Sequence, residues 1–444
     1  MDTIKVIDAK NIPQSFFEPR IFSDDTTGNN ASAIVADILN QVHTEGDKAL
    51  QQLSAKFDKV SLSKIEILQE DLQNAARELK KENPALYDSL CYSRDLALDF
   101  ARKQKECFVD FEVELKPGLF TGQRTLPVER AGLYVPAGRF PLLSSVIMTS
   151  APALASGCNQ VILCTPPRLH PADIQFAYAD KGIMAAAAIC GVHRVFACGG
   201  AQAVAAMAYG TESIPRCDVI AGPGNKFVIE AKRQVYGTVG IDMLAGPSEV
   251  FIIADSSANP EWVALDMLAQ AEHDVDAQAI LATTDKEFAA KVVCQLEALL
   301  KTLPTAEVAK TSLCRNGYII IVDTLEQAAE IANRKAPEHL ELALDKEPVL
   351  EKLSNRLRNY GSLFLGHGAA EVFGDYAAGL NHTLPTSTSA RFTGGLSVRC
   401  FLKTVTTLRT EKGEGQINSA TAAAIMGEAE GLFAHAEAAR LRLK

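Results

Sequence analysis

The chain has 444 residues and a formal net charge of −10, and no block rich in lysine and arginine stands out, which argues against a nucleic-acid partner. With 47% hydrophobic and 22% charged residues, it has ample material for buried cores. No apolar run reaches membrane-spanning length and the first residues do not resemble a signal peptide, so we expect a soluble, cytoplasmic protein without membrane contact. Ten cysteines without a Cys-x-x-Cys pair indicate neither a disulfide framework nor a cysteine-rich zinc module.

The first part of the chain reads as an irregular N-terminal segment, residues 1–27, followed by mostly helical sequence to about residue 105. Strand-like residues begin at 111–115, and from Gly132 strands and helices alternate regularly. This alternation is typical of parallel βα units. The series comprises predicted strands at 132–136, 161–164, 194–197 and 218–221, helices at 144–154, 201–207 and 226–236, and a helical connection through 185–188.

A second series of the same kind follows. Its predicted strands are 249–254, 278–282, 318–322, 340–344 and 362–365, and its helices are 261–273, 286–303, 325–332 and 349–359. The fold class is therefore α/β, with two tandem doubly wound, Rossmann-like parallel-sheet domains, a helical segment near the N-terminus and a helical C-terminal arm that includes residues 421–443. We expect residues 28–112 with 247–393 to form one domain, 113–246 the other, and 394–444 the arm.

The helix predicted at 261–273 carries a polar stripe on an otherwise apolar background. Asn259 and Pro260 are a suitable N-cap and first helical residue, and Asp266, Gln270 and His273 then fall on one face. Gln270 and His273 lie one turn apart, close enough to hold one ion between a carbonyl oxygen and an imidazole nitrogen. The alternative is that the stripe is the solvated side of an amphipathic helix.

Two glycine turns are candidates for nucleotide binding, although the Gly-x-Gly-x-x-Gly fingerprint is absent. Gly199-Gly200 and Gly222-Pro223-Gly224 place backbone N–H groups at helix starts beyond strand ends, where an anion can bind, although ordinary tight turns explain them equally well. Gln202 and Asn225 stand at the mouths of these turns, and Tyr134 lies on the first strand of that series.

Further polar residues occupy connections and the last helix. Glu338 and His339 follow Pro337 just before a strand, where a carboxylate and an imidazole can move protons near neutral pH or simply face solvent. Asp375 lies in a glycine-punctuated loop, and His435 lies on the last helix. With Gln270 and His273, these last two supply two oxygen and two nitrogen donors, a set compatible with zinc.

Six short motifs occur in an order that resembles the histidinol dehydrogenase family, and the resemblance runs from about residue 28 to the C-terminus. They are Gly222-Pro223-Gly224-Asn225, Ala245-Gly246-Pro247-Ser248-Glu249, Gln270-Ala271-Glu272-His273, Ala336-Pro337-Glu338-His339-Leu340, Asn381-His382-Thr383-Leu384-Pro385-Thr386 and the segment 430–435. The resemblance implies a homodimer that oxidises the amino alcohol L-histidinol to L-histidine, with zinc and two NAD, in histidine biosynthesis.

The resemblance also implies a role for each matching residue. The zinc ligands would be Gln270, His273, Asp375 and His435, with the arm carrying His435 into the partner's site. NAD contacts would be Tyr134, Gln202 and Asn225. Substrate contacts would be Ser248, His339, Glu430 and the metal ligands. Glu338 would activate water, and His339 would act as acid and base.

Some segments depart from the usual pattern of histidinol dehydrogenases. They are Arg139-Phe140, the extended stretch 168–188, Thr393-Gly394-Gly395, Cys400-Phe401-Leu402-Lys403 and Thr404-Val405-Thr406. These resemble relatives that oxidise other small polar alcohols, such as sulfonated diols. A catalytically inactive metal- and nucleotide-binding module is the non-enzyme alternative.

Overall fold

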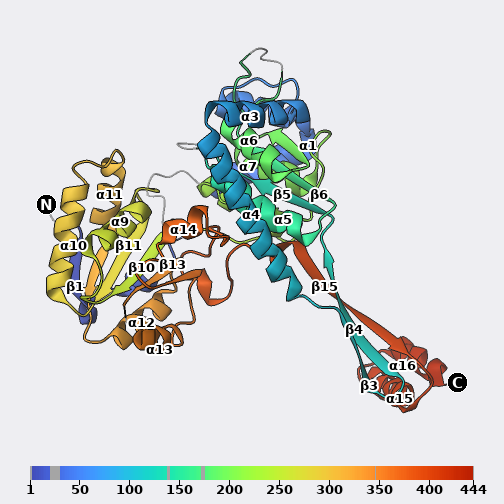
Figure 1. Cartoon of the computed structure of the whole chain (residues 1–444). Helices are drawn as coiled ribbons and strands as arrows, with labels where there is room; N and C mark the ends of the chain where they lie inside the picture. The colour runs from blue at the N-terminus through green and yellow to red at the C-terminus, as the bar shows by residue number, and fades with distance from the viewer. Residues whose placement is uncertain (1–2, 21–30, 138–140, 172–175, 346, 444) are drawn as a thin grey trace.

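The computed structural model describes residues 3–20, 31–137, 141–171, 176–345 and 347–443. It has two α/β lobes and a long arm that projects away from both (Figure 1). The predicted strands of both α/β series are found within two residues of their expected bounds, so the α/β fold class is confirmed. Helix ends differ more, and α11 (Ala306–Asn316) was not expected at all. Asp375 was expected in a loop but lies on the short helix α14 (Glu371–Tyr376).

The first lobe is built on a parallel six-stranded sheet in the order β1-β12-β11-β10-β13-β14. Successive side chains of β10 alternate between two cores, because neighbouring residues of a strand face opposite sides of a sheet: Val250 and Ile252 pack with α9 and α10, and Phe251 and Ile253 with α12. The elements are β1 (Lys5–Asp8), β10 (Glu249–Ala254), β11 (Gln278–Thr283), β12 (Tyr318–Ile321), β13 (His339–Ala343), β14 (Ser362–Leu365), α9 (Pro260–Ala271), α10 (Lys286–Leu299), α11, α12 (Leu325–Lys335), α13 (Glu347–Ser354) and α14 (Glu371–Tyr376).

The second lobe has a six-stranded sheet in the order β2-β7-β6-β5-β8-β9, parallel except for β2, which runs antiparallel to β7. One face is covered by α3 to α6 and the other by α1, α7 and α8. The strands are β2 (Glu66–Ile67), β5 (Arg130–Tyr134), β6 (Gln160–Thr165), β7 (Arg194–Ala197), β8 (Val219–Ala221) and β9 (Gly240–Ile241). The helices are α1 (Ala31–Glu45), α2 (Asp47–Leu53), α3 (Gln69–Glu82), α4 (Pro84–Glu106), α5 (Leu143–Ser156), α6 (Lys181–Cys190), α7 (Gly200–Tyr209) and α8 (Lys226–Val235).

The packing differs from two of the expected groupings. Residues 28–112 were expected to join 247–393, but α1 packs on α7 and α8, α3 on α6, and α4 on α5, all in the second lobe. The N-terminal segment was expected to be irregular, yet β1 pairs in parallel with β12 at the edge of the first sheet. Both differences come from contacts between residues far apart in sequence, which local patterns do not encode.

The arm is a mixed α/β element, although residues 394–444 were expected to be helical. Its stalk is an antiparallel sheet of β3 (Phe111–Lys116), β4 (Leu119–Pro127) and β15 (Leu402–Thr410), so residues 111–127 belong here too. Its tip is formed by α15 (Glu414–Ala429) and α16 (Phe433–Arg440) (Figure 1). The helix expected at 421–443 is broken at Gly431, whose φ of +74° is readily adopted by glycine.

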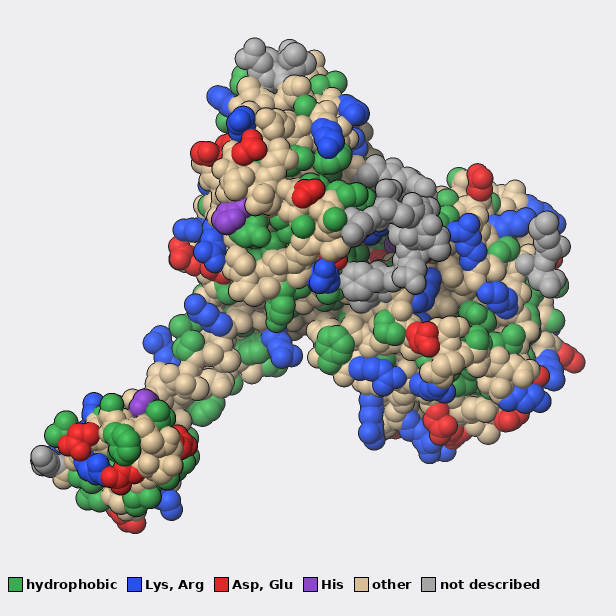
Figure 2. Space-filling model, turned by 180° about the vertical axis from the view of Figure 1, so that it is seen from behind, with side chains coloured by type: hydrophobic (Ala, Val, Ile, Leu, Met, Phe, Trp, Pro, Cys, Tyr) green, Lys and Arg blue, Asp and Glu red, His purple; other side chains and the backbone are tan. Residues whose placement is uncertain are grey.

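Apolar side chains are exposed along this arm, and Figure 2 shows them on its outer end. The most exposed at the tip are Ile425, Met426 and Phe433, and at the stalk Leu408 and Leu115. In all the ranges that the structure describes, the arm included, no helix is both long and apolar enough to cross a membrane.

Candidate functional site

Glu338 and His339 lie at the amino-terminal edge of the first sheet. The turn after α12 leads into β13, which begins at His339, so Glu338 is in the short connection that the sequence predicted. Both residues are buried, 5% and 4% exposed. Glu338 Oε2 accepts a hydrogen bond from the Glu249 N–H at 2.9 Å, and His339 Nδ1 lies 3.2 Å from the Glu249 carbonyl oxygen. The first residue of β10 therefore holds both groups.

Gln270 and Asp375 meet His339 from two other elements. Asn259 caps α9 and Pro260 is its first residue, as predicted, and Gln270 near the helix end is 1% exposed. Its Oε1 lies 3.1 Å from His339 Nδ1, while Nε2 has no hydrogen-bond partner within the described ranges. On α14, Asp375 Oδ1 lies 3.6 Å from His339 Nε2. The sequence placed these four residues in three separate motifs, and the fold brings them together.

Burial and charge shift the proton affinities of this group. Burial raises the pKa of Glu338 to about 8. Burial alone would lower the pKa of His339, but the Glu338, Asp375 and Glu371 carboxylates together raise it to about 10. Burial alone would raise the pKa of Asp375, but the neighbouring His339 brings it below its usual value. A cation bound beside Asp375 would lower the pKa of both Glu338 and His339, because positive charge favours their deprotonated forms.

His273 lies just beyond the end of α9 and is exposed. Its charge is among the influences on the Asp375 pKa, which places the two side chains in the same neighbourhood. Ser248 is half-buried directly before Glu249 at the start of β10. Gln270, His273 and Asp375 thus present an amide, an imidazole and a carboxylate around one end of the Glu338–His339 dyad, a donor set that zinc accepts.

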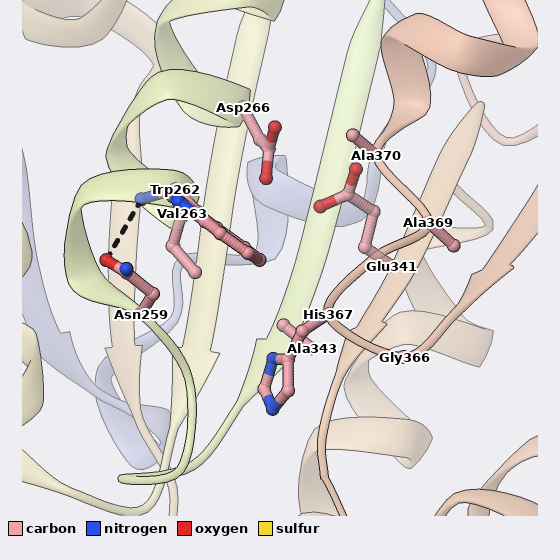
Figure 3. Close-up of a pocket in the computed structure, with 10 residues that line it drawn as sticks. All are labelled: Asn259, Trp262, Val263, Asp266, Glu341, Ala343, Gly366, His367, Ala369 and Ala370. Carbon is pink, nitrogen blue, oxygen red and sulfur yellow. Dashed lines mark hydrogen bonds between the residues drawn. The ribbon is translucent and has the colours of Figure 1, made fainter.

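The stripe on α9 is not simply a solvated helix face. Asp266 and Glu341 project toward one another in a small pocket that Asn259, Trp262 and His367 also line (Figure 3). Burial raises the pKa of Asp266 to about 6, and burial together with the charge of Asp266 raises that of Glu341 to about 8. This pocket is separate from the dyad, although Glu371 links the two: its backbone N–H donates to Glu341 Oε1 at 2.9 Å, and its Oε2 lies 3.8 Å from His339 Nδ1.

The loop after α14 connects the dyad region to the second lobe. His382 Nδ1 lies 2.9 Å from the Asp375 carbonyl oxygen, and its Nε2 lies 3.3 Å from Ser145 Oγ on α5. Asn381 donates to the Met148 carbonyl oxygen on the same helix at 2.6 Å. The position of Asp375 is therefore coupled to the second sheet.

The glycine turns lie at the carboxyl edge of the second sheet, where β5 has β6 on one side and β8 on the other. This is the place where open parallel sheets bind nucleotides. Tyr134 ends β5 and its hydroxyl accepts the Gly200 N–H at 3.1 Å, while burial raises its pKa. Gln202 is buried beside Gly200. Asn225 is exposed and caps α8 through the Phe227 and Val228 N–H groups.

Glu430 and His435 are not part of this arrangement within one chain. Both are exposed at the tip of the arm, Glu430 after α15 and His435 on α16, while α9, β13 and α14 belong to the first lobe (Figure 1). Accordingly, no cluster of three or more His, Cys, Asp or Glu side chains suited to a metal ion occurs in the part of the chain that the structure describes.

Sequence reasoning assigned no role to several buried charges near the two sites. Glu249 and Lys335 form one fully buried pair, Lys232 and Asp242 another, and Glu371 lies beside His339. The available signal was weak: Glu249 ends the Ala245–Glu249 motif and opens an apolar strand, and Lys335 ends a helix as surface lysines often do.

Comparison with known proteins places these features in one family. The model of the family described as histidinol dehydrogenase matches residues 23–443. A histidinol dehydrogenase of Hydrogenovibrio crunogenus is 43% identical over 421 residues, covering 94% of each chain. One of Thermus thermophilus is 43% identical over 415 residues, covering 92% of this chain and 94% of the other. The crystal structure of a histidinol dehydrogenase from Elizabethkingia anophelis superposes with a TM-score of 0.89 at 35% identity, covering 100% and 98% of the two chains.

Proposed function

This chain belongs to the histidinol dehydrogenase family, and we propose that it oxidises L-histidinol through the aldehyde to L-histidine, with two NAD as hydride acceptors. The observation that carries the proposal is the buried Glu338–His339 dyad, which has Gln270 and Asp375 beside it. An acid and a base that are both removed from solvent suit a reaction in which an alcohol loses a proton and a hydride and a water molecule is later activated.

Gln270, His273 and Asp375 would hold zinc together with His435 of the partner subunit. The fit rests on the donor set and on Gln270, whose buried amide has one end without a hydrogen-bond partner among the described residues. The oxygen and nitrogen of a side-chain amide are assigned from their hydrogen bonds. If the Gln270 amide is flipped, its carbonyl oxygen takes the position of Nε2, which has no hydrogen-bond partner among the described residues. When bound, zinc supplies a Lewis acid that orients the amine and imidazole of the substrate.

In the first oxidation, His339 accepts the hydroxyl proton as the carbinol hydride leaves for the nicotinamide. Its Nε2 faces the Asp375 side of the site and is 3.6 Å from Oδ1, too far for a hydrogen bond, so it is available to the substrate. As Glu338 takes a proton from the water that adds to the aldehyde, His339 returns its proton to the aldehyde oxygen, which gives the neutral hydrate. His339 then accepts a hydroxyl proton of this hydrate as the second hydride departs, and the carboxylic acid that forms loses its proton to water.

NAD is bound by Tyr134, Gln202 and Asn225 at the carboxyl edge of the second sheet. Asn225 is exposed at the start of α8, where the N-terminal end of a helix attracts a pyrophosphate. Contacts between the 381–382 loop and α5 connect this edge to the dyad. They fix the position of the NAD-binding residues relative to Glu338 and His339.

Two subunits share each site, and the arm is the shared element. Glu430 and His435 lie at the arm's tip among exposed apolar side chains, an arrangement suited to insertion into a second copy (Figure 2). There, Glu430 and Ser248 contact the substrate, and His435 completes the zinc ligands.

A sulfonated diol is the alternative substrate, and packing accounts for part of the glycine pair that pointed to it. A Cβ on Gly395 would lie 2.5 Å from Leu384 Cδ2, whereas a Cβ on Gly394 would meet no atom within 4 Å. Arg139 and Phe140 lie outside the described residues. An imidazole and an amine suit a zinc site that accepts nitrogen ligands, which favours L-histidinol.

The decisive experiment is NADH formation, followed by absorbance, with L-histidinol and with a sulfonated diol under the same conditions. We expect the higher kcat/KM with L-histidinol and two NADH per substrate consumed. A higher kcat/KM with the diol would overturn the substrate assignment. NAD binding without NADH formation on either alcohol would identify the chain as an inactive binding module.

A further inference from the structure

We propose that two buried lysine–carboxylate pairs act as positioning pairs for the two halves of the site. Lys335–Glu249 aligns the Glu338–His339 dyad, and Lys232–Asp242 aligns the nucleotide-binding turn that starts at Gly222. The roles of the halves rest on the proposed function, whereas the pairs and their hydrogen bonds follow from the geometry alone.

The Lys335–Glu249 pair stands directly behind the dyad. Neither side chain is exposed, and Nζ lies 3.0 Å from Oε1. The other carboxylate oxygen accepts the Ser387 N–H at 3.3 Å. The backbone of Glu249 holds both catalytic side chains, because its N–H donates to Glu338 and its carbonyl faces His339 Nδ1. A displacement of Glu249 therefore moves both members of the dyad together.

The path of the chain increases this dependence. Lys335 ends α12, and the next residue, Ala336, has φ +53°, a left-handed conformation that is unfavourable for a residue with a Cβ. Glu338 follows two residues later. The ion pair anchors the start of this strained turn to β10, and the Glu338–Glu249 hydrogen bond anchors its end. Strain of this kind persists only where the surroundings hold it in place.

The Lys232–Asp242 pair holds the nucleotide turn directly through its side chains. Its side chains are 4% and 0% exposed. Asp242 Oδ2 accepts the Gly222 N–H at 2.8 Å, and Lys232 Nζ donates to the Gly222 carbonyl oxygen at 3.0 Å. Gly222 has φ +121°, and a Cβ there would lie 2.1 Å from the Tyr134 carbonyl oxygen. The pair thus holds the turn close to β5, the strand that ends at Tyr134.

Stability alone is a poor reason for such pairs. Burying two charges costs desolvation energy that their attraction roughly offsets, so apolar residues of similar size often serve a core as well. Instead, the side chains of the Lys232–Asp242 pair bind the backbone N–H and carbonyl oxygen of Gly222. In the other pair, the backbone N–H and carbonyl oxygen of Glu249 contact the side chains of Glu338 and His339. A role in geometry accounts for this placement.

The test compares matched variants of the two pairs, E249Q and K335M against D242N and K232M, each checked for folding by circular dichroism. The readouts are kcat for alcohol and aldehyde oxidation at saturating NAD, and the Kd of NADH measured by fluorescence in the absence of substrate. For the Glu249 pair we expect kcat to fall about tenfold or more in both oxidations, with the NADH Kd within about twofold of wild type. For the Asp242 pair we expect the NADH Kd to rise about tenfold, with a smaller change in kcat.

A general loss of stability would not lower kcat in one set of variants and raise the NADH Kd in the other. Equal changes of kcat and NADH Kd in both sets, or no change in either, would overturn the proposal. If E249Q does not fold, the neutral double variant K335M/E249Q replaces it, because it leaves no buried charge unpaired, and the same readouts decide. A wild-type protein without activity on L-histidinol contradicts the proposed function separately, and kcat is then measured on the alcohol that the protein does oxidise. A protein that oxidises no alcohol overturns the role proposed for the Lys335–Glu249 pair. The NADH affinity still tests the role proposed for the Lys232–Asp242 pair.

Discussion

The substitution Glu338→Gln should separate the two oxidations, because Glu338 is assigned to water activation and His339 to removal of the hydroxyl protons. Glutamine has nearly the same shape and keeps an oxygen that can accept the Glu249 N–H, now 2.9 Å from Glu338 Oε2. The side chain is only 7% exposed, so bulk water cannot take over as base. The loss therefore reports chemistry and not displacement.

The expected fall in rate follows from the loss of a positioned general base. It should be about a hundredfold or more for oxidation of the aldehyde and much less for oxidation of the alcohol. In the wild type, aldehyde oxidation should rise with pH and level off by about pH 8, since burial raises the pKa of Glu338 to about 8, a bound cation lowers it, and only the carboxylate accepts a proton. The variant should lack this rise.

Single-turnover NADH formation with the alcohol and with the separately supplied aldehyde measures both steps, and His339→Asn is the matched control. The control should slow both oxidations by about a hundredfold or more. Equal losses in both steps for both variants, or an unchanged pH profile in Glu338→Gln, would show that the two roles are wrongly assigned.

Three further predictions concern the metal, the dimer and the buried acids. Dialysis against a chelator should abolish activity and zinc should restore it, and full activity in verified metal-free protein would refute the zinc assignment. Mixing inactive His273→Asn and His435→Asn subunits should restore roughly a quarter of wild-type activity, since half of randomly exchanged dimers are mixed and each has one intact site; confirmed mixed dimers without activity would place His435 in its own chain's site or outside any site. Burial, with the charge of Asp266, raises the pKa of Glu341 from 4.5 to about 8, so its stabilising contribution is present below about 4.5 and lost as pH rises through 8. The Tm should accordingly fall between pH 5 and 8, and Glu341→Gln should flatten that fall.

Local patterns in the sequence were sufficient for most elements of the two βα series, although not for β1, β2, β9, α11 and α14. Apolar runs bounded by glycine turns located β7, β10 and β14 at their observed bounds, and Asn259 with Pro260 located the start of α9. These signals depend on a few neighbouring residues: the alternation of buried positions, the capping of free N–H groups and the φ of proline. The grouping of helices with sheets depends on no such signal, which is why α1 to α4 were assigned to the wrong sheet.

The site divides along the same line. The short motifs contain polar residues in otherwise apolar parts of the chain. The family resemblance assigned a role to Gln270, Glu338, His339 and Asp375. Only the tertiary structure decided that Gln270 lies 3.1 Å from His339 and is 1% exposed, because that contact joins α9 to β13 across 69 residues. It also decided that a lysine at a helix end, Lys335, is fully buried against Glu249, since burial depends on what packs around a residue and not on the residue itself.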